Sequence, residues 1–126
     1  MIVVCGAGGF IGGHLVQALL QQGDRPVRAV DVKPLDEWYQ VFPEAQNLQL
    51  DLQEKGACER ALYGASEVYN LAADMGGMGF IENNKALCML SVLINTHLLM
   101  AAQKYDIKRF FFSSSACIYP AYRQTS

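Results

Sequence analysis

Charged residues are few in this sequence, and they do not form clusters. Lys, Arg, Asp and Glu make up 17% of the 126 residues, the formal net charge is −2, and no cluster of Lys and Arg occurs. Proteins that bind nucleic acids usually present a basic patch to the phosphates. We therefore expect no nucleic-acid partner.

Paired metal ligands and paired cysteines are also missing. No C-x-x-C motif occurs, and neither histidine has a second ligand at a spacing typical of metal sites. We expect no metal. The scattered cysteines, and a start without the basic segment of a secretory signal, indicate a cytoplasmic protein with reduced thiols. The residues concerned are Cys5, Cys58, Cys88, Cys117, His14 and His97.

Apolar runs long enough for a membrane are absent too. The best candidate, 83–105, is interrupted by polar residues such as Ser91 and Asn95 and falls short of the ~20 apolar residues that a bilayer requires. We expect no membrane span. The apolar positions instead cover more than one side of a predicted helix, so that one side would cover a sheet. The other side is a candidate seam for a homodimer.

Glycine, by contrast, is concentrated near the start of the chain. Gly6, Gly9 and Gly12 stand between the apolar run 1–4 and a segment whose apolar residues have helical spacing. A backbone without Cβ atoms can turn tightly and approach a diphosphate, whose charge the N–H groups of the next helix favour. We predict a dinucleotide-binding turn that includes Phe10 and Ile11. A glycine-rich turn with only a packing role is the alternative.

Strand-like apolar runs alternate with helical segments along the rest of the chain. Further strands are predicted at 27–31, 48–50, 67–71 and 108–112, with helices over 11–22, 53–63 and 83–105. This order is typical of one α/β domain, 1–126: a Rossmann-type parallel sheet with helices on both faces, incomplete after the fifth strand. Ligands of such sheets gather at the carboxyl ends of the strands.

Aspartates stand at the carboxyl ends of two of these strands, because Asp31 ends the second strand and Asp51 follows the third. Asp31 is placed to accept hydrogen bonds from the adenosine ribose hydroxyls. It would repel a 2′-phosphate and so favours NAD over NADP, although Lys33 and Arg28 are near enough to weaken that preference. Asp51 and Leu52 follow the third strand, where such folds place the adenine. An ordinary turn residue is the alternative for each aspartate.

Small residues follow the fourth predicted strand. Leu71, Ala72 and Ala73 would let the cofactor lie against the backbone, and Gly76 and Gly77 would do the same for a substrate. A flexible crossover loop is the alternative for the second glycine-rich segment.

Three features together resemble the extended short-chain dehydrogenase/reductase family. They are the G-x-x-G-x-x-G turn, Asp31 after the second strand and Ser-Ser-Ser-Ala at the fifth. Two longer segments, 71–80 (LAADMGGMGF) and 114–120 (SSACIYP), are similar to the branch of that family that epimerises GDP-mannose. The resemblance to the family as a whole spans the chain.

The resemblance implies an NAD-dependent epimerase whose substrate is a nucleotide sugar, GDP-mannose. A hydroxyl at C4 would be oxidised to a transient ketone, which acidifies the protons on C3 and C5 before the hydride returns. Ser115 would hold the C4 oxygen, and Ala116 and Gly76 would contact the sugar. Cys117 would exchange protons, because a thiol's ordinary pKa of ~8.5 can be tuned toward neutrality. A small, inert strand-end residue is the alternative for Cys117.

One feature of that family does not occur in these 126 residues, namely its Tyr-x-x-x-Lys pair. Tyr119 and Arg123 have the spacing, but Pro120 interrupts a helix and arginine stays protonated. We expect an N-terminal fragment that lacks the Tyr-x-x-x-Lys helix and the C-terminal substrate region, and that binds NAD without turnover. Another extended family member (a sugar-nucleotide dehydratase or UDP-sugar 4-epimerase) and a non-catalytic NAD-binding module remain the alternatives.

Overall fold

A single parallel sheet forms the centre of the molecule. The computed structural model describes residues 1–72 and 84–112, and its five strands lie in the order β3-β2-β1-β4-β5. The elements are β1 (Ile2–Cys5), α1 (Phe10–Gln22), β2 (Val27–Asp31), the 3₁₀ turn η1 (Leu35–Glu37), β3 (Gln46–Gln49), α2 (Lys55–Leu62), β4 (Glu67–Asn70), α3 (Asn84–Lys104) and β5 (Arg109–Phe112). This confirms the predicted fold class.

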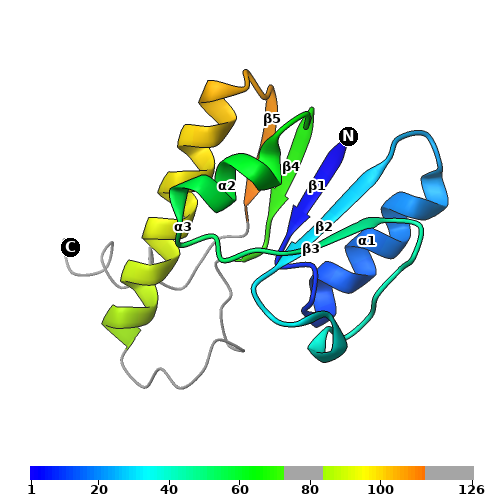
Figure 1. Cartoon of the computed structure of the whole chain (residues 1–126), viewed down its shortest axis with the longest axis horizontal. Helices are drawn as coiled ribbons and strands as arrows, with labels where there is room; N and C mark the ends of the chain where they lie inside the picture. Colours follow the sequence, from blue (N-terminus) through cyan, green and yellow to red (C-terminus); the bar gives the residue numbers. More distant parts are fainter. Residues whose placement is uncertain (73–83, 113–126) are drawn as a thin grey trace, which may run out of the picture.

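Helices cover both faces of the sheet. Figure 1 shows α2 and α3 on one face and α1 on the other. β1 lies in the middle and all four of its residues are buried, as expected for a parallel strand that is covered on both sides. No helix within the described ranges combines the length and the apolar character that a membrane crossing requires.

Each face of the sheet has its own apolar core. Between the sheet and the helices α2 and α3 lie Val3, Cys5, Val30, Leu52, Cys58, Ala61, Leu62, Val68, Ala72, Ile94, Leu98, Ala101 and Ala102. Between the sheet and α1 lie Ile2, Val4, Ala7, Val16, Leu19, Val27, Ala29, Trp38 and Ala45. Alternate residues of β1 enter opposite cores, because successive side chains of a strand point to opposite faces.

Register brings the carboxyl ends of the central strands together. Cys5, the last residue of β1, pairs with Val30 of β2 on one side and with Asn70 of β4 on the other. The segments that follow these three strands therefore start side by side at one edge of the sheet.

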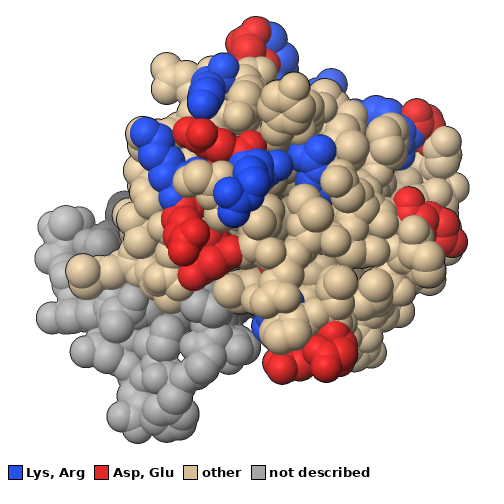
Figure 2. All heavy atoms as spheres, viewed as in Figure 1, with Lys and Arg blue, Asp and Glu red and all other residues tan. Residues whose placement is uncertain are grey.

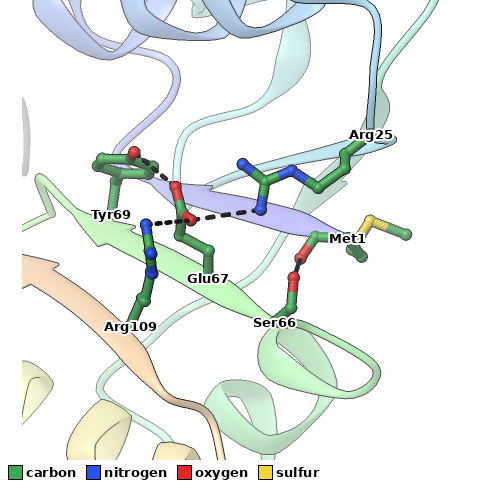
Figure 3. Close-up of polar contacts among 6 residues, drawn as sticks. All are labelled: Met1, Arg25, Ser66, Glu67, Tyr69 and Arg109. Atoms are coloured by element: carbon green, nitrogen blue, oxygen red, sulfur yellow. Dashed lines mark hydrogen bonds and ion pairs between the residues drawn. The ribbon is translucent and has the colours of Figure 1, made fainter.

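A charged network ties the opposite, amino-terminal ends of the strands. Glu67 of β4 is buried, accepts a 2.6 Å hydrogen bond from the Tyr69 hydroxyl, and lies 3.3 Å from an Arg25 nitrogen and 4.0 Å from an Arg109 nitrogen (Figure 3). Nearby, the Ser66 backbone N–H donates to the Met1 carbonyl at 2.8 Å. A buried carboxylate needs such partners, because burial without them is costly.

Acidic and basic residues are mixed on the surface that faces the viewer. In Figure 2 the Lys and Arg side chains lie among Asp and Glu side chains on this face. Two of the ion pairs within the described residues are Lys104–Glu59 at 3.2 Å and Lys108–Asp106 at 3.1 Å.

Candidate functional site

The glycine turn between β1 and α1 is shaped by close backbone contacts. Gly6 has a φ of +84°, and a Cβ atom on it would lie 2.7 Å from the carbonyl carbon of Leu71. The N–H groups of Gly6 and Ala7 both donate to the Val30 carbonyl, at 2.8 and 3.0 Å. At Gly12 a Cβ atom would collide with the Gly6 carbonyl oxygen. Gly6 and Gly12 are therefore required by the fold itself, so the packing role considered as an alternative is part of their function.

Gly9 differs from its neighbours, because its missing Cβ faces open space. Among described atoms, a Cβ there would approach only the Gly6 oxygen, at 3.6 Å, which is ordinary contact. Gly9 is the N-cap of α1, and within the described chain no side chain caps this helix and its first turn holds no acidic residue. The first N–H groups of a helix lack intrahelical partners and favour an anion.

The residues predicted to bind the diphosphate, Gly6 to Gly12, thus form a turn with exposed backbone at Gly9, which we call the glycine cradle. Phe10 and Ile11, the first two residues of α1, expose 58% and 65% of their surface beside it. Phe10 also makes edge-on contacts with His14 and Tyr39, at ring-centroid distances of 4.5 and 4.9 Å. The open backbone at Gly9 and the first N–H groups of α1, which have no partners within the helix, fit the diphosphate of NAD.

Asp31 is attached directly to this cradle. It is buried at the end of β2, and its Oδ2 accepts a 2.8 Å hydrogen bond from the Gly8 N–H while its Oδ1 accepts one of 3.0 Å from the Lys33 N–H. Each carboxylate oxygen keeps a second lone pair, so both can still accept from ribose hydroxyls. The Asp31 carboxylate is therefore held at a fixed position relative to the glycine turn.

Trp38 and Gly8 complete this arrangement, and the sequence analysis did not identify either. A Cβ on Gly8 would lie 2.9 Å from the Trp38 ring and 2.9 Å from Asp31 Oδ2. The Trp38 indole N–H donates to the Lys33 carbonyl at 2.8 Å, which holds the ring in place. Gly8 is a fourth glycine within 6–12 that the G-x-x-G-x-x-G motif does not require. This extra glycine was the feature of the sequence that could have indicated a close contact at position 8.

The sequence suggested that Arg28 lies near enough to Asp31 to weaken its preference for NAD, but the Arg28 side chain has other partners. Its guanidinium is buried against the carboxyl end of α2, where Nη1 donates to the carbonyls of Ala61 at 2.6 Å and Tyr63 at 2.8 Å. Burial lowers its pKa from the ordinary arginine value. Arg28 therefore stabilises α2, and of the two basic residues only Lys33 borders Asp31.

Asp51 and Leu52 occupy the turn between β3 and α2. Asp51 Oδ1 accepts a 3.0 Å hydrogen bond from the Gln53 N–H, which is the local role expected of a turn aspartate. The Leu52 side chain is buried in the α2–α3 core, and its carbonyl accepts from the Cys58 thiol at 3.1 Å. Contact of either residue with adenine stays a prediction.

Leu71 and Ala72 follow β4 and form the wall of the glycine turn. The Leu71 N–H donates to the Cys5 carbonyl at 2.8 Å, which continues the sheet pairing by one residue. The buried side chain of Asn70 holds Ala72 in place, because the Asn70 Oδ1 accepts a 3.0 Å hydrogen bond from the Ala72 N–H. Asn70 was not identified from the sequence, where it reads only as a polar residue inside a strand.

Among the described residues, the thiols of Cys5 and Cys58 are held in their protonated form. Burial, followed by the neighbouring Cys58 and Asp31, raises the pKa of the Cys5 thiol far above its ordinary range. Burial, followed by Asp51 and Glu59, raises the pKa of Cys58 to about 12. Both cysteines are free thiols.

The remaining predicted site residues lie outside the described residues. These are Ala73, Gly76, Gly77, Ser115, Ala116 and Cys117. Their roles stay predictions. Within the described ranges, no three His, Cys, Asp or Glu side chains are grouped as metal ligands would be.

Comparisons with known proteins agree with this geometry. GDP-mannose 3,5-epimerase of Arabidopsis thaliana is 39% identical over 98% of this chain and 33% of its own length, and GDP-mannose 3,5-epimerase 1 of Oryza sativa subsp. japonica is 40% identical over 98% and 32%. The chain therefore spans about a third of the length of these curated relatives.

Solved structures of similar fold include enzymes and an NAD complex. UDP-glucose 4-epimerase of Thermotoga maritima superposes with a TM-score of 0.76 at 25% identity, covering 91% of this chain and 38% of that one. A short-chain dehydrogenase/reductase superfamily protein of Agrobacterium tumefaciens with bound NAD has a TM-score of 0.69 at 30% identity, covering 95% and 34%.

One family model matches nearly the whole chain, residues 2–126. Together with the glycine cradle, the attached Asp31 and the parallel sheet, this match shows that the chain belongs to the NAD dependent epimerase/dehydratase family, with NAD as its cofactor.

Proposed function

We propose that this chain is the NAD-binding part of a nucleotide-sugar epimerase that acts on GDP-mannose. The observation that carries the binding part is the cradle at Gly9, where open backbone lies beside Asp31 and the start of α1. The choice of GDP-mannose as the substrate is supported by the 39–40% identity to GDP-mannose 3,5-epimerases. The other curated relatives compared are 30% identical or less.

Each group of residues has a role in this proposal. The N–H groups at the start of α1 hold the diphosphate, Asp31 holds the ribose, and the backbone of Leu71 and Ala72 supports the cofactor beside Gly6. Ala73 keeps its predicted contact with the cofactor. Bound NAD would supply the hydride acceptor for the sugar's C4 carbon. Ser115 orients the C4 oxygen and Cys117 transfers protons at the neighbouring carbons. The free thiols of Cys5 and Cys58 favour the reducing cytoplasm as the location.

Titration with NAD tests the binding part directly. Trp38 is the one tryptophan of the sequence and packs against Gly8 beside Asp31, so its fluorescence should respond to the cofactor. Gly9→Val should weaken NAD at least about tenfold, because the branched side chain would fill the space of the phosphates. Gly56→Ala is the matched control, since a Cβ on Gly56 meets nothing within 4 Å in the described structure. Equal affinity of the Gly9→Val variant and the wild type would contradict the proposal.

A second candidate is an epimerase of UDP-sugars, which the structural likeness to UDP-glucose 4-epimerase favours. Calorimetric titration of the NAD-saturated chain with GDP-mannose and, separately, UDP-glucose distinguishes the two. With a chain that spans the full length of the curated relatives, we expect heat of binding with GDP-mannose only. Binding of UDP-glucose alone would favour the second candidate.

A further inference from the structure

A pair of asparagines connects α3 to the wall of the cofactor site. Asn70 ends β4 and its side chain is fully buried. Its Nδ2 donates a 3.1 Å hydrogen bond to Oδ1 of Asn95, a half-buried residue of α3. Buried amides need partners at both ends, and here the other end of Asn70 binds the Ala72 N–H.

The backbone N–H of Ala72 determines which way the two asparagine amides are oriented. The Ala72 N–H can only donate, so the Asn70 atom that faces it must be the oxygen. The opposite end of Asn70 is then an NH₂ group, and Asn95 has to present an oxygen to it. Any residue at position 95 without an acceptor would leave the buried NH₂ group unpaired.

Ala72 in turn lies against the glycine turn. A Cβ on Gly6 would come within 2.8 Å of the Ala72 nitrogen. The preceding residue, Leu71, is fixed to Cys5 through a 2.8 Å backbone hydrogen bond. A displacement of Ala72 therefore moves the surface that faces Gly6, at the start of the cradle.

We propose that Asn70 and Asn95 are positioning residues for the cofactor, through which α3 fixes the wall of the NAD site at Ala72. This rests on the proposed role of the glycine cradle in binding NAD. Among the described residues, Asn95 reaches this wall through its hydrogen bond to Asn70, so we expect its effect to be on the geometry of the site.

Variants of Asn95 test this proposal. Asn95→Leu has a similar size but no acceptor, and should weaken NAD about tenfold. Asn95→Asp keeps an acceptor oxygen and should bind within about twofold of the wild type. Thr96→Ala, at the next and exposed position of α3, is the control. Asn95→Ala, which favours helix, serves as a second acceptor-free variant if Asn95→Leu folds poorly.

Hydrogen exchange of the Ala72 amide is a second readout that needs no cofactor. In Asn95→Leu and Asn95→Ala this amide should exchange faster than in the wild type, and in Asn95→Asp it should not. Unchanged exchange, or unchanged NAD affinity in both acceptor-free variants, would overturn the positioning role. If the wild type itself fails to bind NAD, the proposed function is at fault, and Ala72 exchange still decides whether the pair holds the turn.

Discussion

At Gly12 a Cβ atom would collide with the Gly6 carbonyl oxygen, whereas at Gly56 it would meet nothing within 4 Å among described atoms. Both glycines lie in helices, where replacement by alanine is by itself favourable by about 1 kcal/mol. We predict that Gly12→Ala nevertheless lowers the free energy of unfolding by about 1–3 kcal/mol, because backbone atoms must separate. Gly56→Ala should raise it. Urea unfolding of both variants provides the measurement, and a Gly12→Ala variant as stable as Gly56→Ala would refute the steric argument.

Single residues of the site differ in how well the sequence predicts them. The positions of Gly6 and Asp31 were predictable, because Gly6 follows one apolar strand and Asp31 ends another, while their contacts with a cofactor stay predictions. Gly8, Trp38 and Asn70 were not, because their importance lies in contacts between distant segments. No local pattern marks a tryptophan that closes over a glycine thirty positions earlier.

Elements were predicted best where apolar spacing is strong and flanking residues end the element. The strand Val27–Asp31 was predicted with its observed bounds, and α1 ends at Gln22 with Gly23 in the left-handed conformation, at a φ of 72°. β3 starts at Gln46, two residues before its predicted start, because it is a polar, partly exposed edge strand whose extent depends on pairing with Arg28. α2 starts at Lys55, after a turn closed by Asp51.

The Glu67 carboxylate joins β4, β5 and the α1–β2 connection through Tyr69, Arg109 and Arg25. The hydrogen bond from Tyr69 is the main cause that lowers the pKa of Glu67; Arg25 and Arg109 add to the lowering, and burial opposes it. The same bond raises the pKa of Tyr69. Because the folded pKa of Glu67 is depressed, its contribution to stability is present above the ordinary glutamate value, about 4.3, and is lost as pH falls through the folded pKa.

We therefore predict that Glu67→Gln flattens the acid limb of the stability curve. Melting temperatures of wild type and variant, measured from neutral pH down to about pH 3, should differ most near neutrality and converge in acid. Glu59→Gln is the control, because Glu59 pairs with Lys104 at the surface. A constant difference between wild type and Glu67→Gln at all these pH values would show that the carboxylate's charge is not the cause. Figure 3 displays Tyr69, Arg25 and Arg109 around the carboxylate whose charge this variant would remove.

For the molecule as a whole, the alternation of strands and helices determined the topology. It predicts a parallel sheet, and the parallel sheet places the ends of β1, β2 and β4 together at the cradle. The proposed substrate could not be derived in the same way, because the residues predicted to contact it lie in 73–83 and 113–126, outside the described residues. Family resemblance, and not patterning, supplied that part.

The face of α3 that points away from the sheet bears on how copies of the chain associate. Ile94, Leu98 and Ala101 are buried against the sheet and α2. The opposite side exposes an apolar stripe of Met89, Val92, Leu93, Leu99 and Met100, in which Met89 is 72% and Val92 59% exposed. Val92 and Leu99, and likewise Leu93 and Met100, lie seven residues apart. Such spacing on an exposed helix is typical of a helix–helix seam, and exposed apolar patches of this kind mark interfaces.

We propose that a second copy of the chain covers this stripe, and predict that the double variant Val92→Lys, Leu99→Lys is monomeric at concentrations at which the wild type is dimeric. Two lysines on each copy would bring like charges together and leave their ammonium groups without water, which opposes association. Leu35→Lys is the control, since Leu35 is an exposed apolar residue of η1, away from the stripe. Sedimentation equilibrium provides the measurement. A monomeric wild type, or a dimer that survives the double substitution, would mean that the stripe does not join two copies. Because Asn95 lies on the same helix, NAD affinity measured in parallel would show whether association at the stripe also affects the cofactor site.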